Sequence, residues 1–275
     1  MTEQLPDRRA ELAEALKNCG YKPGGLKPGS PEWLEREKAK TQRDADYKNS
    51  IPGKLNQDDG VDCPICLNRG YVYSITEDGL DLVAHRCKCM EKRRIVENAR
   101  RSGLGLLVHK KLDDYRTEED WQKAVKATAV DYIKNPSGWF VALGQPGSGK
   151  TLICGIVASY LLRKGRIVEL KSWPELVRES GTGWFKDRDT LRRYKEVEVL
   201  FIDDFLKQGT DNRSMQMAYE ILNYRYNYRM PTIISGEKRI PEMWQLDEAL
   251  ASRMVEMSGA HLLDMGENPE RNKRL

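Results

Sequence analysis

The stretch "WFVALGQPGSGKT" (residues 139–151) decides the fold of this chain. Five apolar residues lead directly into the pattern G-x-x-x-x-G-K-T, and the residues after it have helical character through Leu162. A glycine-rich loop between a buried strand and a helix turns its backbone N–H groups toward a bound phosphate. The stretch therefore predicts a nucleotide-binding α/β domain.

The residues of this phosphate loop have separate expected roles. Lys150 is expected to reach the β- and γ-phosphates, and the Thr151 hydroxyl to bind Mg²⁺. The predicted cofactors are therefore ATP and Mg²⁺. The predicted nucleotide-binding residues are Gly144, Gln145, Pro146, Gly147, Ser148, Gly149, Lys150 and Thr151.

An acidic pair supplies the second half of the predicted site. In "VLFIDDF" (199–205), four apolar residues precede Asp203, which places a carboxylate at the end of a buried strand. Asp203 is expected to hold Mg²⁺ through water, and Asp204 to orient or deprotonate the attacking water. The alternative is that Asp204 only caps the following segment. The pair favours ATP hydrolysis over phosphate transfer to a small molecule.

Short apolar runs alternate with helical stretches after residue 136, which predicts parallel strands with helices on both faces. Ser235 ends the fourth strand, where it is expected to touch the attacking water or the γ-phosphate. A helix over 211–229 is expected to place Met215, Tyr219, Leu222 and Tyr226 on one face. The five strands are expected at 139–143, 166–171, 197–204, 231–235 and 261–265.

Four of the six cysteines lie between residues 63 and 89, as a C-x₂-C pair and a C-x-C pair. Two such pairs can hold one Zn²⁺ with Zn–S distances of ~2.3 Å, in a structural site with no open position. The expected ligands are Cys63, Cys66, Cys87 and Cys89. The alternatives are that His85 replaces Cys87 or Cys89, or that no metal is bound.

Composition sets the remaining limits. The chain has 275 residues with 32% charged residues and a net charge of +4, and it lacks both a secretory signal and an apolar run of membrane length. We expect a cytoplasmic protein with no membrane partner. The expected organisation is a helical and linker segment (1–62), a zinc module with a basic connecting helix (63–111) and an ATPase domain (112–275).

Two basic segments are candidates for nucleic-acid contact. Residues 86–111 carry nine Lys or Arg against two Glu. In "ESGTGWFKDRDTLRRYK" (179–195), aromatic and cationic residues alternate, a combination suited to single-stranded DNA. The alternative is that the aromatic residues pack into the core and the charges are only solvated. The residues concerned are Trp184, Phe185, Lys186, Arg188, Arg192 and Arg193.

Four segments together resemble the bacterial replicative helicase loaders of the DnaC/DnaI type, in the AAA+ class, especially their phage and Gram-positive branch. They cover roughly residues 100–275 in the order typical of that family. The segments are "SGLGLLVHKKLDDYRTEEDWQKAV", "VLFIDDFLKQG", "EILNYRYNYRMPTIIS" and "DEALASRMVEM".

This resemblance implies further roles. Lys150 and Thr151 match the Walker A positions, Asp203 and Asp204 match the Walker B pair, and Ser235 falls near the sensor-1 position. Arg253 matches an arginine that completes the site of a neighbouring subunit. Arg274 is the candidate for a C-terminal arginine that senses phosphate.

The implied partners are a hexameric replicative DNA helicase, held by the N-terminal module, single-stranded DNA, and further copies of the chain assembled with ATP. ATP hydrolysis is expected to release the helicase, at a slow rate that partners stimulate. One alternative is an IstB-like transposition helper ATPase acting on duplex DNA. The other is a small-molecule P-loop kinase.

Overall fold

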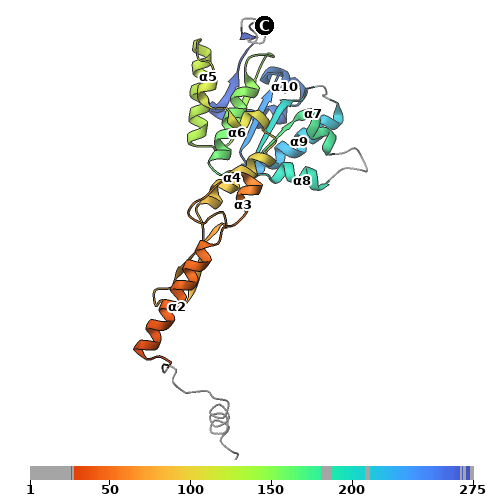
Figure 1. Cartoon of the computed structure of the whole chain (residues 1–275). Coiled ribbons are helices and arrows are strands. Elements are labelled where there is room, and N and C mark those ends of the chain that lie inside the picture. Colours follow the sequence, from red (N-terminus) through yellow and green to blue (C-terminus); the bar gives the residue numbers. More distant parts are fainter. Residues whose placement is uncertain are drawn as a thin grey trace, which may run out of the picture. The chain divides into compact units, whose positions relative to one another are not determined.

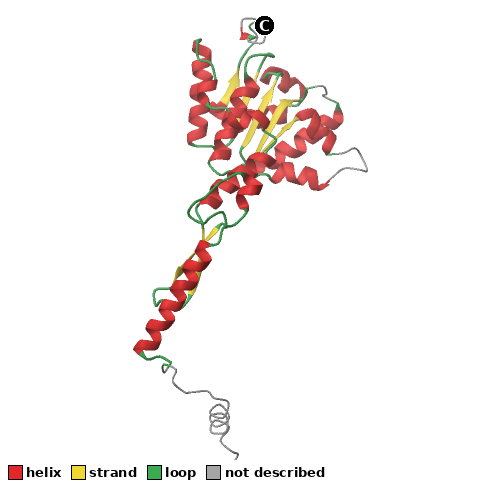
Figure 2. Ribbon diagram, in the orientation of Figure 1, coloured by secondary structure: helices red, strands yellow, loops and turns green. Residues whose placement is uncertain are grey.

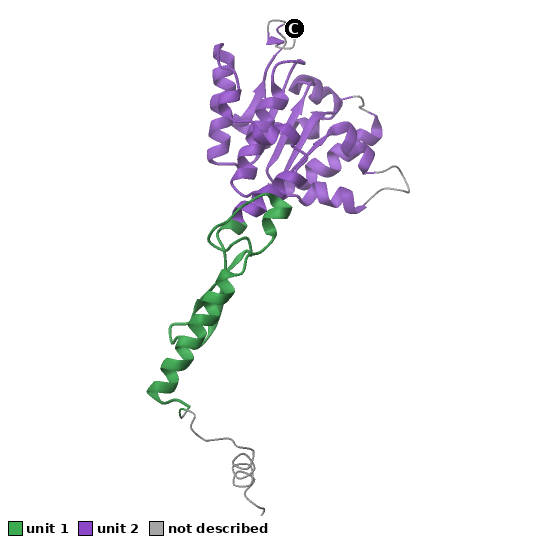
Figure 3. Ribbon diagram, viewed as in Figure 1, with its two compact units in different colours: residues 1–90 green, residues 91–275 purple. Residues whose placement is uncertain are grey.

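The computed structural model describes residues 26, 28–180, 188–207, 211–266, 268 and 271–272. It divides into two compact units, residues 1–90 and 91–275 (Figure 3). Residues 91–111, which the sequence groups with the cysteine-rich segment, belong to the second unit. The reason is that Leu104, Leu107 and Val108 pack into the hydrophobic core of that unit. No helix in the described ranges is long and apolar enough to cross a membrane.

The first unit contains a long helix, a short helix and an antiparallel hairpin (Figure 1). The long helix begins where the sequence predicts, because Pro31 occupies its first turn and the Ser30 side chain accepts a hydrogen bond from Trp33 N at 3.2 Å. The elements are α2 (Pro31–Ser50), α3 (Leu55–Asp59), β1 (Tyr71–Ile75), β2 (Leu82–Arg86) and the start of α4 (Cys89–Arg101).

The hairpin was not predicted from the sequence. Its strands pair antiparallel from Tyr71 opposite Arg86 to Ile75 opposite Leu82. The end of α2 is joined to it by Asn49, whose side chain donates to Tyr73 O (2.8 Å) and accepts from Tyr73 N (2.9 Å). The Asn49 side chain thus makes the two backbone hydrogen bonds with Tyr73 that a neighbouring strand would otherwise make.

The second unit contains a parallel sheet covered by helices (Figure 2). All five predicted strands are present. The strands are β3 (Trp139–Leu143), β4 (Val168–Ser172), β5 (Val199–Phe205), β6 (Thr232–Gly236) and β7 (Leu262–Asp264). The helices after α4 are α5 (Asp120–Lys134), α6 (Lys150–Arg163), α7 (Trp173–Glu179), α8 (Arg188–Glu196), α9 (Asn212–Asn227), α10 (Ile240–Leu246) and α11 (Glu248–Ser258). The described residues of this unit also form the short 3₁₀ turns η1 (Gly105–His109), η2 (Leu112–Asp114) and η4 (Gly259–His261).

The strand order of the sheet is β4-β5-β6-β3-β7. The strand before the phosphate loop (β3) and the strand that carries the acidic pair (β5) are therefore separated by β6. Since the strands are parallel, their carboxyl ends meet at one edge. In open α/β sheets this edge is where ligands bind.

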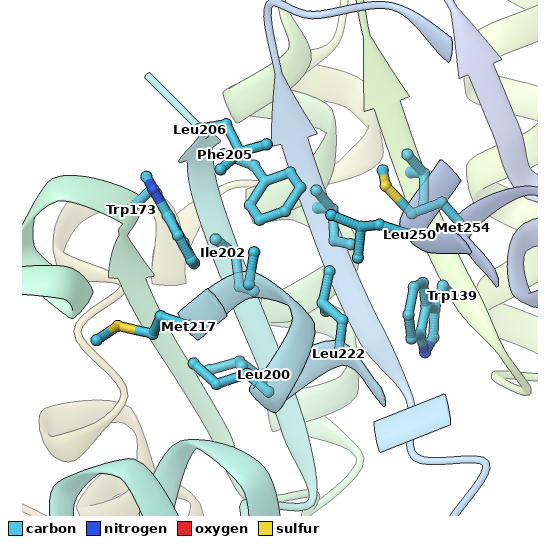
Figure 4. Packing of buried hydrophobic residues seen from close by; sticks show 14 of the residues in the cluster. Trp139, Trp173, Leu200, Ile202, Phe205, Leu206, Met217, Leu222, Leu250 and Met254 are labelled. Carbon is cyan, nitrogen blue, oxygen red and sulfur yellow. The ribbon is translucent and has the colours of Figure 1, made fainter. Parts of the chain in front are cut away.

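Alternate residues of the central strands point into two separate cores. On β3, Trp139 and Val141 face the core formed with α9 and α11, whereas Phe140 and Ala142 face the core formed with α5 and α6. Figure 4 shows the first of these cores, to which Trp139, Ile202 and Leu250 belong. Both faces are buried, which explains why the strands are continuously apolar in sequence.

The edge strand β4 is covered on its free side by the segment before η1. Leu170 N donates a hydrogen bond to Ser102 O (2.6 Å). Gly103 has a φ of +73°, and a Cβ added there would lie 2.6 Å from Leu170 O. Only glycine fits this backbone-to-backbone contact, which satisfies the edge of the sheet.

The apolar face expected on α9 is partly wrong. Leu222 is buried as predicted, but Tyr219 is 40% exposed. The residues of α9 that are buried instead include Met217, Ala218 and Ile221. Tyr219 thereby remains available to a charged partner on α11.

Candidate functional site

The phosphate loop connects β3 to the start of α6, as its pattern predicts. Two of its glycines are required by their neighbours as well as by their positive φ angles. A Cβ on Gly147 (φ +79°) would lie 1.9 Å from Asn272 Oδ1, and one on Gly149 (φ +84°) would lie 3.3 Å from the Tyr115 ring. The loop is thus closely packed between Tyr115 and Asn272.

The end of the loop meets the acidic strand. Thr151 Oγ1 donates a hydrogen bond to Asp203 Oδ1 at 2.9 Å. The hydroxyl and carboxylate oxygens gathered here are the donor types that Mg²⁺ prefers, and Thr151 and Asp203 would hold the ion. The two residues predicted as magnesium ligands are therefore brought together.

Ser235 lies between them on β6, as expected, but its hydroxyl does not line the cavity beside the loop. It is 1% exposed, donates a hydrogen bond to Asp203 Oδ1 and accepts one from Asp204 N at 3.2 Å. Both hydrogen bonds hold the acidic pair in place. In this structure the Ser235 hydroxyl therefore supports the acidic pair, and its expected contact with the water or the γ-phosphate stays a prediction.

A backbone irregularity directs Asp204 away from Asp203. The pairing of β5 with β6 shifts register between Ile202 and Phe205, and Asp204 has a φ of +53°. Aspartate tolerates this left-handed conformation better than most residues. The shift places Asp204 in the wall of the cavity, where a water-orienting residue is needed.

The cavity beside the loop has a volume of about 350 Å³. Its charged residues are Lys150, Asp204, Lys207 and Glu237, and its remaining lining is Leu107, Pro146, Gly147, Gly149, Thr151 and Leu152. Lys150 is 6% exposed and donates a hydrogen bond to Gln145 O at 2.6 Å. Burial lowers the pKa of Lys150, although the nearby carboxylates of Glu237 and Asp204 oppose this change.

A second cavity of about 210 Å³ is also lined by residues of the loop, Gly147, Ser148 and Gly149. Tyr115 is 5% exposed there, and its hydroxyl finds no hydrogen-bond partner within the described part of the chain. The Arg271 guanidinium lies 5.1 Å from the centre of the Trp121 ring. The aromatic walls and the free hydroxyl suit a nucleoside. The sequence reasoning gave Tyr115 and Trp121 no role; their aromatic character just upstream of the loop was the available signal.

Arg253 lies on α11, away from the lining of either cavity as far as the chain is described. Its guanidinium lies 5.3 Å from the ring centres of both Tyr219 and Tyr226, and Nη1 donates to Ala249 O at 2.9 Å. Two tyrosines of α9 thus hold the arginine. Arg274, the second arginine predicted for the site, lies outside the described residues.

The second basic segment is described only in part. Trp184, Phe185 and Lys186 lie outside the described residues. Of the arginines, Arg193 pairs with the buried Glu169. Arg192 lies within 4 Å of both Asp189 and Glu196. These two arginines therefore have acidic partners within the chain.

The four predicted cysteines form one cluster in the first unit, with all four sulfurs within 4.8 Å of one another. The Sγ–Sγ distances are 3.8 Å for Cys63–Cys87 and 3.5 Å for Cys66–Cys89. Sulfurs at ~2.3 Å around a tetrahedral Zn²⁺ are separated by about 3.8 Å. The cysteine geometry therefore fits a zinc ion.

The surroundings of Cys66 favour the thiolate form that binds zinc. Burial opposes ionisation of Cys66, but the hydrogen bond from Gly70 N and the neighbouring cysteines lower the pKa of Cys66 to about 6. The predicted alternative ligand, His85, lies on β2 with Nε2 2.7 Å from Ser74 Oγ, and it is not part of the cluster. Cys154 is buried in α6. The four-cysteine set is the one that the structure assembles.

Comparison with known proteins matches residues 73–274 to the family described as IstB-like ATP binding protein. The chain is 32% identical over 235 residues to the phage-like element PBSX protein XkdC of Bacillus subtilis, spanning 78% of this chain and 86% of that protein. It is 24% identical over 153 residues to the replicative helicase loader DnaC of Escherichia coli, spanning 52% and 61% of the two chains. A crystal structure of the DnaC helicase loader superposes with a TM-score of 0.50 at 21% identity, over 57% of this chain and 96% of that one, which supports the fold.

Proposed function

Because the chain belongs to the family of IstB-like ATP-binding proteins and is related to DnaC-type helicase loaders, we propose that it is an ATPase that loads a replicative DNA helicase onto single-stranded DNA. The single observation that carries this proposal is the joining of Thr151 to Asp203 beside the charged cavity, in a chain related to replicative helicase loaders. That pair matches the arrangement needed to hold a nucleotide with its metal ion.

Each residue of the site has a role in hydrolysis. The backbone of the phosphate loop and Lys150 bind the phosphates and offset their negative charge. When bound, Mg²⁺ supplies a positive charge that polarises the phosphate oxygens. Asp204 orients the attacking water and accepts its proton, while Ser235 keeps the acidic pair fixed by donating a hydrogen bond to Asp203 and accepting one from Asp204 N.

The second cavity binds the nucleoside. Its position against the phosphate loop places it next to the phosphates, and the Trp121 and Tyr115 side chains offer apolar surface to a base. The buried Tyr115 hydroxyl can donate or accept a hydrogen bond. A base that satisfies it removes the cost of leaving a buried polar group unpaired.

Assembly with other copies uses Arg253. The tyrosines of α9 hold the guanidinium on the outside of its own site, which favours contact with the nucleotide of a neighbouring subunit. ATP then joins adjacent subunits around single-stranded DNA. Loss of the γ-phosphate on hydrolysis removes that contact and loosens the assembly.

The first unit is the candidate for holding the helicase. It has its own small core around Cys63, Cys66 and Cys87, so a zinc ion at the cluster would stabilise it as a separate module. A closed four-thiolate site leaves no position for a substrate. The role of zinc is therefore structural, and partner contact falls to the surface around it.

The test is the mass and the ATPase rate of the purified full chain, mixed with the replicative helicase of its source, with and without single-stranded DNA. We expect a stable complex that is lost when Cys66 is replaced by serine, and hydrolysis that DNA or helicase stimulates. The Asp203→Asn variant serves as the control for catalysis. Absence of a complex under all conditions contradicts the loader proposal.

A second candidate function is that of a transposition helper ATPase of the IstB kind, and the matched family model favours it. It shares the nucleotide site but differs in partner. ATP-dependent assembly on duplex DNA, with no complex formed with the helicase, would support this alternative over the loader.

A further inference from the structure

Lys207 is a second lysine in the cavity beside the phosphate loop, and neither the motif nor the acidic pair accounts for it. It lines the cavity together with Lys150. Its Nζ lies 3.1 Å from Asp204 Oδ2 and 3.2 Å from Glu237 Oε1. Lys207 therefore connects the end of β5 to the residue that follows β6.

The backbone brings this side chain back toward the site. Asp204 and Leu206 both have positive φ angles, +53° and +55°, and Lys207 N donates a hydrogen bond to Asp204 O at 3.0 Å. Leu206 is 1% exposed and packs into the core, which anchors the turn. Two non-glycine residues in this conformation cost energy, so the surrounding structure determines the turn.

The position of Lys207 along a bound triphosphate follows from its neighbours. Thr151 and Asp203 mark the metal position, and Asp204 marks the side from which water attacks. Water attacks the terminal phosphate, so the groups that contact Asp204 in this cavity lie at the γ-phosphate end. Lys207 is the cation in that place, because its Nζ contacts Asp204 Oδ2 at 3.1 Å within the lining of this cavity.

The charges of the cavity lead to the same conclusion. Lys150 and Lys207 balance Asp204 and Glu237, the other charged residues of the lining. Without Lys207, two carboxylates at the γ-phosphate end would face the negative charge of the phosphate. A hydrogen bond between two charged groups contributes more than one between neutral groups.

We propose that Lys207 contacts the γ-phosphate from within the same subunit and so distinguishes ATP from ADP. In the structure Glu237 and Asp204 hold its ammonium group. When ATP binds, the ammonium moves to the γ-phosphate, and Asp204 is left free to orient water. This proposal depends on the proposed ATPase function and adds a specific residue to it.

The test compares equilibrium binding of ADP and of a non-hydrolysable ATP analogue, both with Mg²⁺, by the full chain. In Lys207→Met we expect the affinity for the analogue to fall by about 10- to 100-fold, while the affinity for ADP stays within about twofold. Lys207→Arg should retain part of the preference. The matched control is Lys238→Met, because Lys238 directly follows Glu237 in the chain but is not among the residues that line the cavity.

The Glu237→Gln variant tests the same contact by changing a partner of Lys207 and not Lys207 itself. It removes one of the two acids that hold Lys207, so it should raise the affinity for the analogue and leave that for ADP unchanged. Thermal unfolding without nucleotide shows whether Lys207→Met is folded. If that variant does not fold, Glu237→Gln tests the γ-phosphate contact of Lys207 in its place.

The outcomes separate the two proposals. If the wild-type chain binds neither nucleotide, the proposed ATPase function fails. If the wild type binds both, while Lys207→Met and Glu237→Gln bind them in the wild-type ratio, the γ-phosphate contact is overturned and the ATPase proposal stands.

Discussion

Thr151 Oγ1 donates a hydrogen bond to Asp203 Oδ1 across 2.9 Å, although the two residues are 52 positions apart, Thr151 in the first turn of α6 and Asp203 on β5. Ser235, on the intervening β6, donates to the same carboxylate oxygen. The hydroxyl and the carboxylate that we propose to hold Mg²⁺ are thus in direct hydrogen-bond contact.

Replacing Asp203 with asparagine should separate nucleotide binding from hydrolysis. The amide keeps the shape of the side chain but removes the negative charge that attracts Mg²⁺. We expect the hydrolysis rate to fall by at least about 100-fold. Nucleotide binding measured without Mg²⁺ should be unchanged, and a full hydrolysis rate in this variant would contradict the assignment.

Replacing Asp204 with asparagine tests the water-orienting role. Asparagine accepts the positive φ of this position, so the turn should be retained. We expect the hydrolysis rate to fall about 10²- to 10⁴-fold, the usual contribution of a general base. ATP affinity should not decrease. If Asp204 only capped the next segment, thermal stability would fall and the hydrolysis rate per folded molecule would not.

Mixing two inactive variants tests the role of Arg253 between subunits. Arg253→Ala should bind nucleotide normally and lose stimulated hydrolysis, and Lys150→Ala should lose nucleotide binding. In a mixture, an intact phosphate loop from the first variant can meet an intact Arg253 from the second. We expect the mixture to regain part of the stimulated rate. If the two variants are shown to assemble together and the mixture still hydrolyses ATP no faster than either variant alone, Arg253 does not act between subunits.

Removing the metal should unfold the first unit and spare the second. Cys66→Ser, or a strong chelator, breaks the cluster that forms the core of the first unit. We expect one zinc per wild-type chain, no zinc in the variant, and rapid proteolysis confined to residues before the second unit. ATP binding should be unaffected, because the second unit has its own cores. Cys154→Ser, which changes a cysteine outside the cluster, is the control for zinc content.

Two glycines of one segment provide a matched pair for stability. Gly103 and Gly105 both have positive φ angles, but an added Cβ meets Leu170 O at 2.6 Å only at Gly103, and nothing within 4 Å at Gly105. Alanine at either position costs about 1 kcal/mol or more in backbone strain. Gly103→Ala should lower the free energy of unfolding by about 1–3 kcal/mol more than Gly105→Ala does, because it also displaces the backbone segment that lies against β4. Equal losses in denaturant titrations would contradict this account.

Several features of the site were predictable because each depends on a local pattern. Residues adjacent in sequence are enough to recognise these features. They are the glycine-rich loop after an apolar strand, the acid at the end of another strand and the paired cysteines. The β1–β2 hairpin was missed, although "YVYSITEDGLDLVAH" (71–85) alternates around an Asp-Gly turn, a recognisable hairpin signal. The face of α9 was partly misassigned, because aromatic residues can pack against a cation as well as in a core.

The sequence by itself determined the phosphate loop, the acidic pair, the five strands and the four cysteines, because short-range patterns of glycine, charge and hydrophobicity specify them. Only the tertiary structure decided that Ser235 supports Asp203, that Tyr115 and Trp121 line a second cavity, and that Lys207 joins Asp204 to Glu237. These relationships depend on strand order and on the direction of turns. Both are set by packing between residues distant in sequence, which no local pattern contains.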